Sequence, residues 1–198
     1  MVKLGFLLLS GGQSKRMGTH KALLEIEGGR LLDVIASAGN GFAERILSAN
    51  DPTIPTPEGF ARCEDVYPGC GPMAGIHAAL SMTACDALVS APCDAPNYSE
   101  ELAQYLAQQY DPAYDALILT DETGRAHPLM GVYGKSCLPV LDTHLREGRY
   151  KMMLMLEGMR LKKMTLPARL SQQVFDNLNT PQDVQAYRDG RHKQCNRA

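Results

Sequence analysis

The chain has 198 residues, which suffices for one large domain or two small ones. Apolar residues make up 44% of it and charged residues 21%, so its composition is globular and excludes collagen-like, low-complexity and disordered classes. Its 20 Lys and Arg residues against 22 Asp and Glu residues give a formal net charge of −2, which argues against a general nucleic-acid-binding protein.

Short apolar runs alternate with helical patterns along the chain. The first run predicts a buried strand over residues 5–9, followed by a tight turn at Gly11 and Gly12. It is too short for a membrane span or a signal-peptide core, so we expect a cytoplasmic protein that does not contact membranes. Further strands are expected over residues 45–49, 62–66, 87–90, 116–120, 129–133, 160–166 and 173–176. Helices are expected over residues 31–38, 72–83, 100–109, 135–146 and 151–156, and from residue 181 onward.

The alternation of strands and helices predicts one α/β domain over residues 1–188 with a mainly parallel sheet. The direction of the strands at 129–133 and 160–166 stays open. Ser99 is a good N-cap for the helix that follows it, and a frayed basic tail is expected from Asp189. The six cysteines contain no Cys-x-x-Cys pair, so we expect free thiols rather than disulfides or a zinc site.

The strongest local signal follows the first strand. Small residues there let the backbone turn sharply, so that its N–H groups can surround phosphate oxygens. Arg16 can grip a phosphate with its planar guanidinium, and Lys21 adds a point charge. The spacing is not that of a P-loop, and an ordinary glycine-rich turn with exposed basic residues is the alternative. The candidates for phosphate binding are Leu9, Ser10, Gly11, Gly12, Arg16 and Lys21.

Two aspartates follow strands further along the chain. Asp65 precedes a segment rich in Gly and Pro, and Asp94 follows the strand at 87–90. Their separation suits one βαβ unit, so parallel neighbouring strands are expected to bring both carboxylates to one sheet edge, together with Asn50. A carboxylate beside a polyphosphate predicts Mg²⁺, which prefers one or two carboxylates plus phosphate oxygens. A loop-capping role is the alternative for Asp94.

Weaker signals come from three other places. Gly71 lies in a glycine- and proline-rich loop that permits a ligand near the backbone, or that only starts the next helix. Asn177 and Asn179 offer carbonyl oxygens that suit a metal, although the same sequence describes a helix entrance. Cys93 invites a covalent role, but we favour a small buried thiol.

Taken in order, five motifs resemble the molybdenum cofactor guanylyltransferase family of the nucleotidyltransferase superfamily. They are Leu-Ser-Gly-Gly-x-Ser-x-Arg-Met-Gly-x-x-Lys from Leu9, Asp65 with Pro-Gly-x-Gly-Pro-Met-Ala-Gly, Pro-Cys-Asp-x-Pro around Asp94, His127-Pro128, and Asn-x-Asn-Thr-Pro from Asn177. The resemblance covers residues 3–188 and implies a Rossmann-like, three-layer α/β/α fold. It also implies transfer of GMP from GTP to molybdopterin or the molybdenum cofactor, with Mg²⁺ dependence and release of pyrophosphate. The Gly-Gly form of the first motif resembles guanylyl enzymes, whereas cytidylyl relatives usually carry Ala-Gly.

The resemblance implies roles for individual residues. It assigns the triphosphate to the glycine turn with Arg16 and Lys21, the nucleoside to the surroundings of Asp65, and Mg²⁺ to Asp94. Asn179 is expected to assist the metal or the pterin side. We therefore expect catalytic roles for Arg16, Lys21 and Asp94, and metal binding by Asp94 and Asn179. The residues expected to bind the substrates and cofactor are Leu9, Ser10, Gly11, Gly12, Lys21, Asn50, Asp65, Gly71 and Asp94.

Two positions depart from the family pattern. His20 stands where the family usually has Asp, and Ser48 where many relatives have Asn. His20 motivates one alternative, a weakly catalytic carrier of nucleotide or molybdopterin; the other is a related enzyme that uses CTP or a sugar or alcohol phosphate. His127, Arg149 and Lys151 are candidates for contacts with the second substrate, against a structural His and a solvated surface. Apo-molybdoenzymes or other cofactor-assembly proteins are expected partners.

Overall fold

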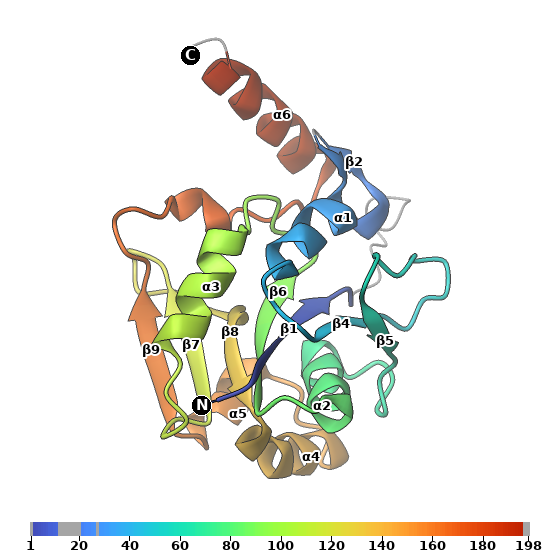
Figure 1. Cartoon of the computed structure of the whole chain (residues 1–198), viewed down its shortest axis with the longest axis vertical. Helices are drawn as coiled ribbons and strands as arrows, with labels where there is room; N and C mark the ends of the chain where they lie inside the picture. Colours follow the sequence, from blue (N-terminus) through green and yellow to red (C-terminus); the bar gives the residue numbers. More distant parts are fainter. Residues whose placement is uncertain (1, 12–20, 27, 196–198) are drawn as a thin grey trace.

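The computed structural model describes residues 2–11, 21–26 and 28–195 of the chain. Its centre is a seven-stranded sheet with the strand order β5-β4-β1-β6-β8-β7-β9 (Figure 1). These strands are β1 Leu4–Leu9, β4 Arg45–Ser48, β5 Ala61–Cys63, β6 Ala87–Pro92, β7 Ala116–Thr120, β8 Ala126–Gly134 and β9 Leu161–Thr165. A separate antiparallel hairpin pairs β2 Glu25–Ile26 with β3 Gly29–Arg30.

Helices cover both faces of the sheet, so the fold has the three α/β/α layers that we expected (Figure 1). The α-helices are α1 Leu31–Ala36, α2 Pro72–Met82, α3 Glu100–Gln109, α4 Leu138–Arg146, α5 Met152–Glu157 and α6 Pro181–Cys195. Short 3-10 helices are η1 Lys21–Leu23, η2 Ser37–Gly39, η3 Lys135–Cys137 and η4 Gln172–Phe175. None of the helices in the described part of the chain is long and apolar enough to cross a membrane.

Strand β1 shows how alternate side chains build the two cores. Phe6 and Leu8 belong to the core shared with α1 and α3, whereas Leu7 and Leu9 belong to the core shared with α2, α4 and α5. All four side chains are buried, as expected for a central strand covered on both faces. The continuous apolar run that predicted this strand therefore reflects burial on both sides.

The sheet is mainly parallel, as the sequence predicted. Strand β8 runs antiparallel to both of its neighbours, β6 and β7, and the other ladders of this sheet are parallel. The strand expected at 129–133 is thus the antiparallel one, and the strand expected at 160–166 pairs parallel to β7. Ser99 caps α3 as predicted, because its side chain accepts a hydrogen bond from the backbone N of Leu102 at 3.2 Å.

The strand predicted over residues 173–176 is wrong. Residues 173–175 belong to η4, a 3-10 helix, and Asp176 follows it directly. Ser171 starts it by accepting a hydrogen bond from the backbone N of Gln173 at 3.2 Å. Only Val174 of this segment is buried, so the apolar alternation that supports a strand is missing.

Three smaller differences concern element boundaries. The strand expected over 62–66 ends at Cys63, where the chain leaves the sheet. Helix α6 extends past Asp189 to Cys195, and the fraying expected for this tail stays a prediction. The hairpin of β2 and β3 was not predicted, because strands of two residues are too short to show a periodic pattern.

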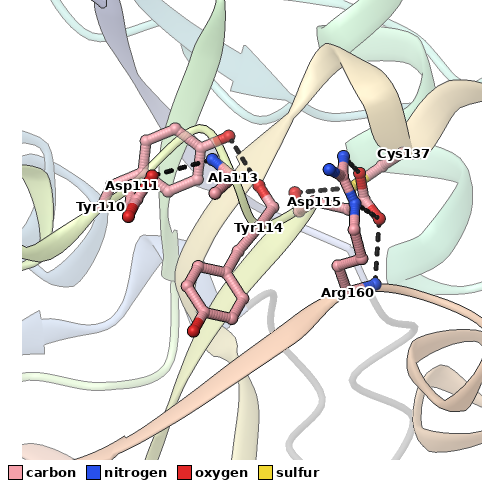
Figure 2. Close-up of polar contacts among 7 residues, drawn as sticks. All are labelled: Tyr110, Asp111, Ala113, Tyr114, Asp115, Cys137 and Arg160. Atoms are coloured by element: carbon pink, nitrogen blue, oxygen red, sulfur yellow. Dashed lines mark hydrogen bonds and ion pairs between the residues drawn. The ribbon is translucent and has the colours of Figure 1, made fainter.

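An ion pair fastens the sheet at the edge where β7 and β9 begin (Figure 2). Asp115 precedes β7 and Arg160 precedes β9, so the parallel pairing of the two strands brings their side chains together. The Asp115 carboxylate accepts hydrogen bonds from Nε, Nη2 and the backbone N of Arg160 at 3.1, 2.5 and 2.9 Å. The hydrogen bonds from Arg160 hold the pKa of Asp115 well below its usual range. Cys137 Sγ donates to the backbone oxygen of Asp115 at 3.0 Å.

Candidate active site

The carboxyl ends of β1, β4, β5 and β6 meet along one edge of the sheet, and the segments that follow them surround a cavity of about 150 Å³. A more open hollow of about 760 Å³ shares part of its wall. Ligands of open α/β sheets bind at this edge. Most of the residues singled out in the sequence line the cavity: Leu9, Ser10, Gly11, Lys21, Asn50, Asp65, Gly71 and Asp94.

The two aspartates reach this edge in a different way from the one we expected. Asp65 follows β5 and Asp94 follows β6, but β4 and β1 lie between those two strands. The expectation of neighbouring strands is therefore wrong, because the chain between β5 and β6 crosses to the far side of β1. Both carboxylates still line the cavity, from opposite flanks of its floor.

On the β6 side, Lys21 connects two distant segments. Its Nζ donates a hydrogen bond to Asn179 Oδ1 at 2.5 Å and lies 3.6 Å from Asp94 Oδ2. The segment of Asn179 is held in place because the backbone N of Leu178 donates to the backbone oxygen of Asp94 at 2.8 Å. Burial raises the pKa of the Asp94 carboxyl, and Lys21 acts in the opposite direction. Asn177 is exposed and outside the cavity wall.

On the β5 side, Asn50 and Asp65 bind each other reciprocally. Asn50 Nδ2 donates to Asp65 Oδ2 at 2.6 Å, and the backbone N of Asp65 donates to Asn50 Oδ1 at 2.8 Å. Burial raises the pKa of Asp65, while the hydrogen bond from Asn50 lowers it. The two side chains line both hollows and therefore present one fixed polar unit to a ligand.

The N-terminus of α2 opens onto the same cavity. Gly71 enters the helix at a φ of 72°, a left-handed conformation that favours glycine, and nothing lies within 4 Å of the position that a Cβ would take. One turn later, Gly75 lies against Ser48 so closely that a Cβ on it would come within 2.4 Å of Ser48 Oγ. Backbone N–H groups at a helix N-terminus attract anions, which suits a phosphate ligand at this point.

Leu129 is a cavity-lining residue that the sequence did not identify. Leu129 lines the cavity because β8 slips in register against β7. Ile118 of β7 faces Gly131, but the next residue, Leu119, faces His127, so that residues 128–130 bulge out of the ladder. Bulges of this kind re-aim side chains next to sites.

The residues predicted to contact a second substrate lie outside the cavity wall. His127 Nε2 is 3.0 Å from Asp121 Oδ2, and its ring stacks on Phe175 with centroids 4.1 Å apart. These contacts favour the structural interpretation of His127. Arg149 and Lys151 are exposed, and neither lines the cavity.

Gly12, Arg16 and His20 lie outside the described residues, so the expectations for them stay predictions. Among the residues that are described, no group of three or more His, Cys, Asp and Glu side chains is arranged to hold a metal ion. Asp94 with Asn179 offers one carboxylate and one amide oxygen near Lys21. Such a donor set suits Mg²⁺ when phosphate oxygens complete the coordination shell.

The comparisons with known proteins point to the same family, and each of them covers most of the chain. A family model described as the MobA-like NTP transferase domain matches residues 6–187. A probable molybdenum cofactor guanylyltransferase of Carboxydothermus hydrogenoformans is 30% identical over 93% of this chain and 95% of its own length. A molybdenum cofactor guanylyltransferase of Yersinia pestis is 31% identical over 95% of this chain and 96% of its own. The crystal structure of molybdopterin-guanine dinucleotide biosynthesis protein A from Archaeoglobus fulgidus is 25% identical, with a TM-score of 0.79 over 96% of this chain and 99% of its own.

Proposed function

The chain belongs to the family of MobA-like NTP transferase domains and is thus a nucleotidyltransferase, and we propose that it transfers GMP from GTP to molybdopterin or the molybdenum cofactor. Pyrophosphate is the other product, because the acceptor phosphate displaces it from the α-phosphorus. The observation that carries this proposal is that Lys21, Asp94 and Asn179 meet near Ser10 and Gly11 at the carboxyl edge of the sheet. The names of the relatives supply the nature of the transferred group and of the acceptor.

The two flanks of the cavity suit the two ends of a nucleotide. Gly11 and the N-terminus of α2 offer backbone N–H groups for the triphosphate, and Lys21 offers positive charge. Ser10 lines the cavity beside them, although its own backbone N donates to Ser48 O at 2.9 Å. The Asn50 and Asp65 pair, on the opposite flank, supplies fixed polar atoms for the nucleoside. The wider hollow beside that pair gives room for a base. We therefore place the nucleoside toward β5 and the reacting phosphates toward β6.

The proposed reaction brings two anions together, so the site must neutralise and align them. Lys21 can contact phosphate oxygens on the developing pyrophosphate, and Arg16 is expected to do the same. Asp94 and Asn179 would hold a divalent ion of the kind this family generally uses, and we propose Mg²⁺, which would withdraw charge from the phosphate oxygens. Burial raises the pKa of the Cys93 thiol to about 11, so it stays neutral near pH 7, and we assign it no covalent role.

The decisive experiment measures pyrophosphate release with GTP, CTP or ATP, each with and without molybdopterin and with Mg²⁺ or a chelator. Release that needs GTP, molybdopterin and Mg²⁺ together supports the proposal. Release with CTP, or with a sugar or alcohol phosphate as acceptor, replaces it with a related transferase. Tight binding of GTP or molybdopterin with no release under any condition indicates a carrier protein instead.

The proposed product is a cofactor, so other proteins must take it up. We propose that the reaction takes place in the cytoplasm, where both substrates are soluble. We further propose that apo-molybdoenzymes, or other proteins of cofactor assembly, receive the dinucleotide product. Co-purification of the product-loaded protein with an apo-molybdoenzyme tests this step separately from the chemistry.

A further inference from the structure

The segment between β5 and α2, residues 64–71, carries much of the wall on the nucleoside side. Asp65, Gly69 and Gly71 from this segment line the wider hollow. The segment is largely exposed, and Val66 retains 63% of its surface. Two of its glycines have φ values of 79° and 72°. A segment of this kind needs contacts that fix its path, because ordering each exposed residue costs conformational entropy.

Asn50 fixes one side of this segment through Asp65. The opposite side is fixed by Tyr67, which lines neither hollow and packs instead on the core of α2, α4 and α5. Its hydroxyl donates a hydrogen bond to Asp142 Oδ1 on α4 at 2.6 Å and accepts one from Arg146 Nε at 3.3 Å. Hydrogen bonds to a charged acceptor at such a short distance are among the stronger ones in proteins.

The partners of Tyr67 are themselves held in place. Arg146 Nη2 is 3.0 Å from Asp142 Oδ2, one helical turn apart on α4. His77 on α2 meets the Tyr67 ring edge-on, with centroids 5.4 Å apart, and its Nε2 is 3.9 Å from Asp142 Oδ1. Burial lowers the pKa of His77, and the nearby Asp142 carboxylate acts in the opposite direction. The acceptor on α4 therefore has a fixed position relative to α2, whose N-terminus opens onto the cavity.

We propose that Tyr67 and Asp142 form an anchor that holds residues 64–71 in the conformation that binds the nucleotide. Tyr67 is then a positioning residue, because it acts on the substrate through Asp65 and Gly71 and touches neither substrate. The inference rests on the proposed function, since it specifies how the nucleoside side of that same site is prepared. Loss of the anchor leaves the chemistry at Asp94 and Lys21 intact but reduces the fraction of molecules that are ready to bind.

The experiment compares Tyr67→Phe, Asp142→Ala and Asp142→Asn with the wild-type protein. The first two remove the donor and the acceptor, whereas Asp142→Asn keeps a carbonyl oxygen for the Tyr67 hydroxyl. Tyr114→Phe is the matched control, because this tyrosine is exposed beside Asp115, at the opposite edge of the sheet (Figure 2). Two quantities are measured: KM and kcat for GTP, and amide hydrogen exchange of residues 64–71 in the ligand-free protein.

We expect KM for GTP to rise about tenfold in Tyr67→Phe and Asp142→Ala, which corresponds to about 1.4 kcal/mol, with kcat within about twofold of wild type. Amide exchange of residues 64–71 becomes faster in both variants. Asp142→Asn restores both quantities toward wild type, and Tyr114→Phe changes neither. A general loss of stability does not produce this split or this rescue.

Unchanged KM and unchanged exchange in Tyr67→Phe overturn the anchor, and so does a fall in kcat at constant KM. Failure of the proposed function looks different. In that case the wild-type protein itself releases no pyrophosphate from GTP, while amide exchange still reports whether Tyr67 and Asp142 hold the segment. The two failures are therefore distinguishable within one set of samples.

Discussion

The Asp94 carboxyl is subject to two opposing influences in the ligand-free protein, its burial and the positive charge of Lys21. Burial raises its pKa, so the carboxylate is costly to keep charged, and Lys21 at 3.6 Å offsets only part of this cost. A side chain kept in such a position at the expense of stability is typical of a functional site. Asp65 is also partly buried, but Asn50 holds its carboxylate, which fits a positioning role better than metal binding.

The first prediction orders these two carboxylates. Asp94→Asn is expected to lower the single-turnover rate of the proposed reaction about a thousandfold at saturating Mg²⁺, equivalent to about 4 kcal/mol, because the amide lacks the negative charge. Asp65→Asn is expected to cost less than about tenfold, since an amide oxygen can still accept from Asn50. A slower Asp65 variant reverses the assignment of the metal ligand. Thermal unfolding of the ligand-free Asp94→Asn protein supplies the control, and no loss of stability is expected.

The second prediction concerns the cations. Lys21→Ala removes the group that contacts both Asn179 and Asp94. Two unit charges about 4 Å apart interact by about 4 kcal/mol at an effective dielectric of 20, so we expect a loss of at least a hundredfold in kcat/KM. Arg16→Ala is expected to behave similarly. Circular dichroism checks that both variants stay folded, and near-normal turnover in both contradicts the phosphate assignment.

At the scale of elements, sequence patterns correctly predicted those helices, strands and caps that depend on a few consecutive residues. The buried run at β1, the Ser99 cap and the strand at β7 depend on a few consecutive residues, and each is where the sequence put it. Pairing between distant strands was not predictable in this way. The spacing between Asp65 and Asp94 does not reveal which strands lie between β5 and β6 in the sheet. The sequence therefore predicted the correct sheet edge for both carboxylates but the wrong strand neighbours.

The bulge in β8 is a second feature of this kind, because it is a register shift in the pairing of β8 with the distant strand β7. A Cβ on Gly131 would come within 2.1 Å of the backbone oxygen of Leu117 on β7. The bulged segment is tied back to β6, where Ser90 Oγ donates to the backbone oxygen of Leu129 at 3.0 Å. Pro128 immediately precedes the strand expected at 129–133 but lies inside β8 as observed, and proline in a strand marks an edge or a bulge.

The third prediction tests this close approach. Gly131→Ala is expected to destabilise the protein by about 3 kcal/mol, because backbone atoms of β7 cannot move aside as a flexible side chain can. Gly190→Ala in α6 is the matched control, since nothing lies within 4 Å of the position that its new Cβ would take and alanine favours helices. Urea unfolding measures both. Equal stability of Gly131→Ala and wild type would show that β7 and β8 can separate without cost.

At the scale of the whole molecule, the two ends of the sheet strands differ in what they carry. The carboxyl edge carries the cavity and the polar side chains that line it. The opposite edge carries the ion pair of Asp115 and Arg160 (Figure 2). This pair fixes β7 to β9 at the outer part of the sheet. Changes there are expected to affect stability with little effect on the proposed chemistry, because the core of the sheet separates the two ends.

The fourth prediction uses the pH dependence of this pair. Arg160 holds the pKa of Asp115 below its unfolded value of about 4, so the stabilisation is fully present above about pH 4 and is lost as the pH falls toward the depressed folded value. Asp115→Asn is therefore expected to lower the free energy of unfolding by about 1 kcal/mol at pH 7, a modest figure because the Arg160 side chain is 62% exposed. The difference between variant and wild type should shrink on titration from pH 5 to pH 2. Urea unfolding across that range measures it, with KM for GTP at pH 7 as the control for the distant site. A difference that grows with acidity gives the opposite sign and contradicts the role assigned to Arg160.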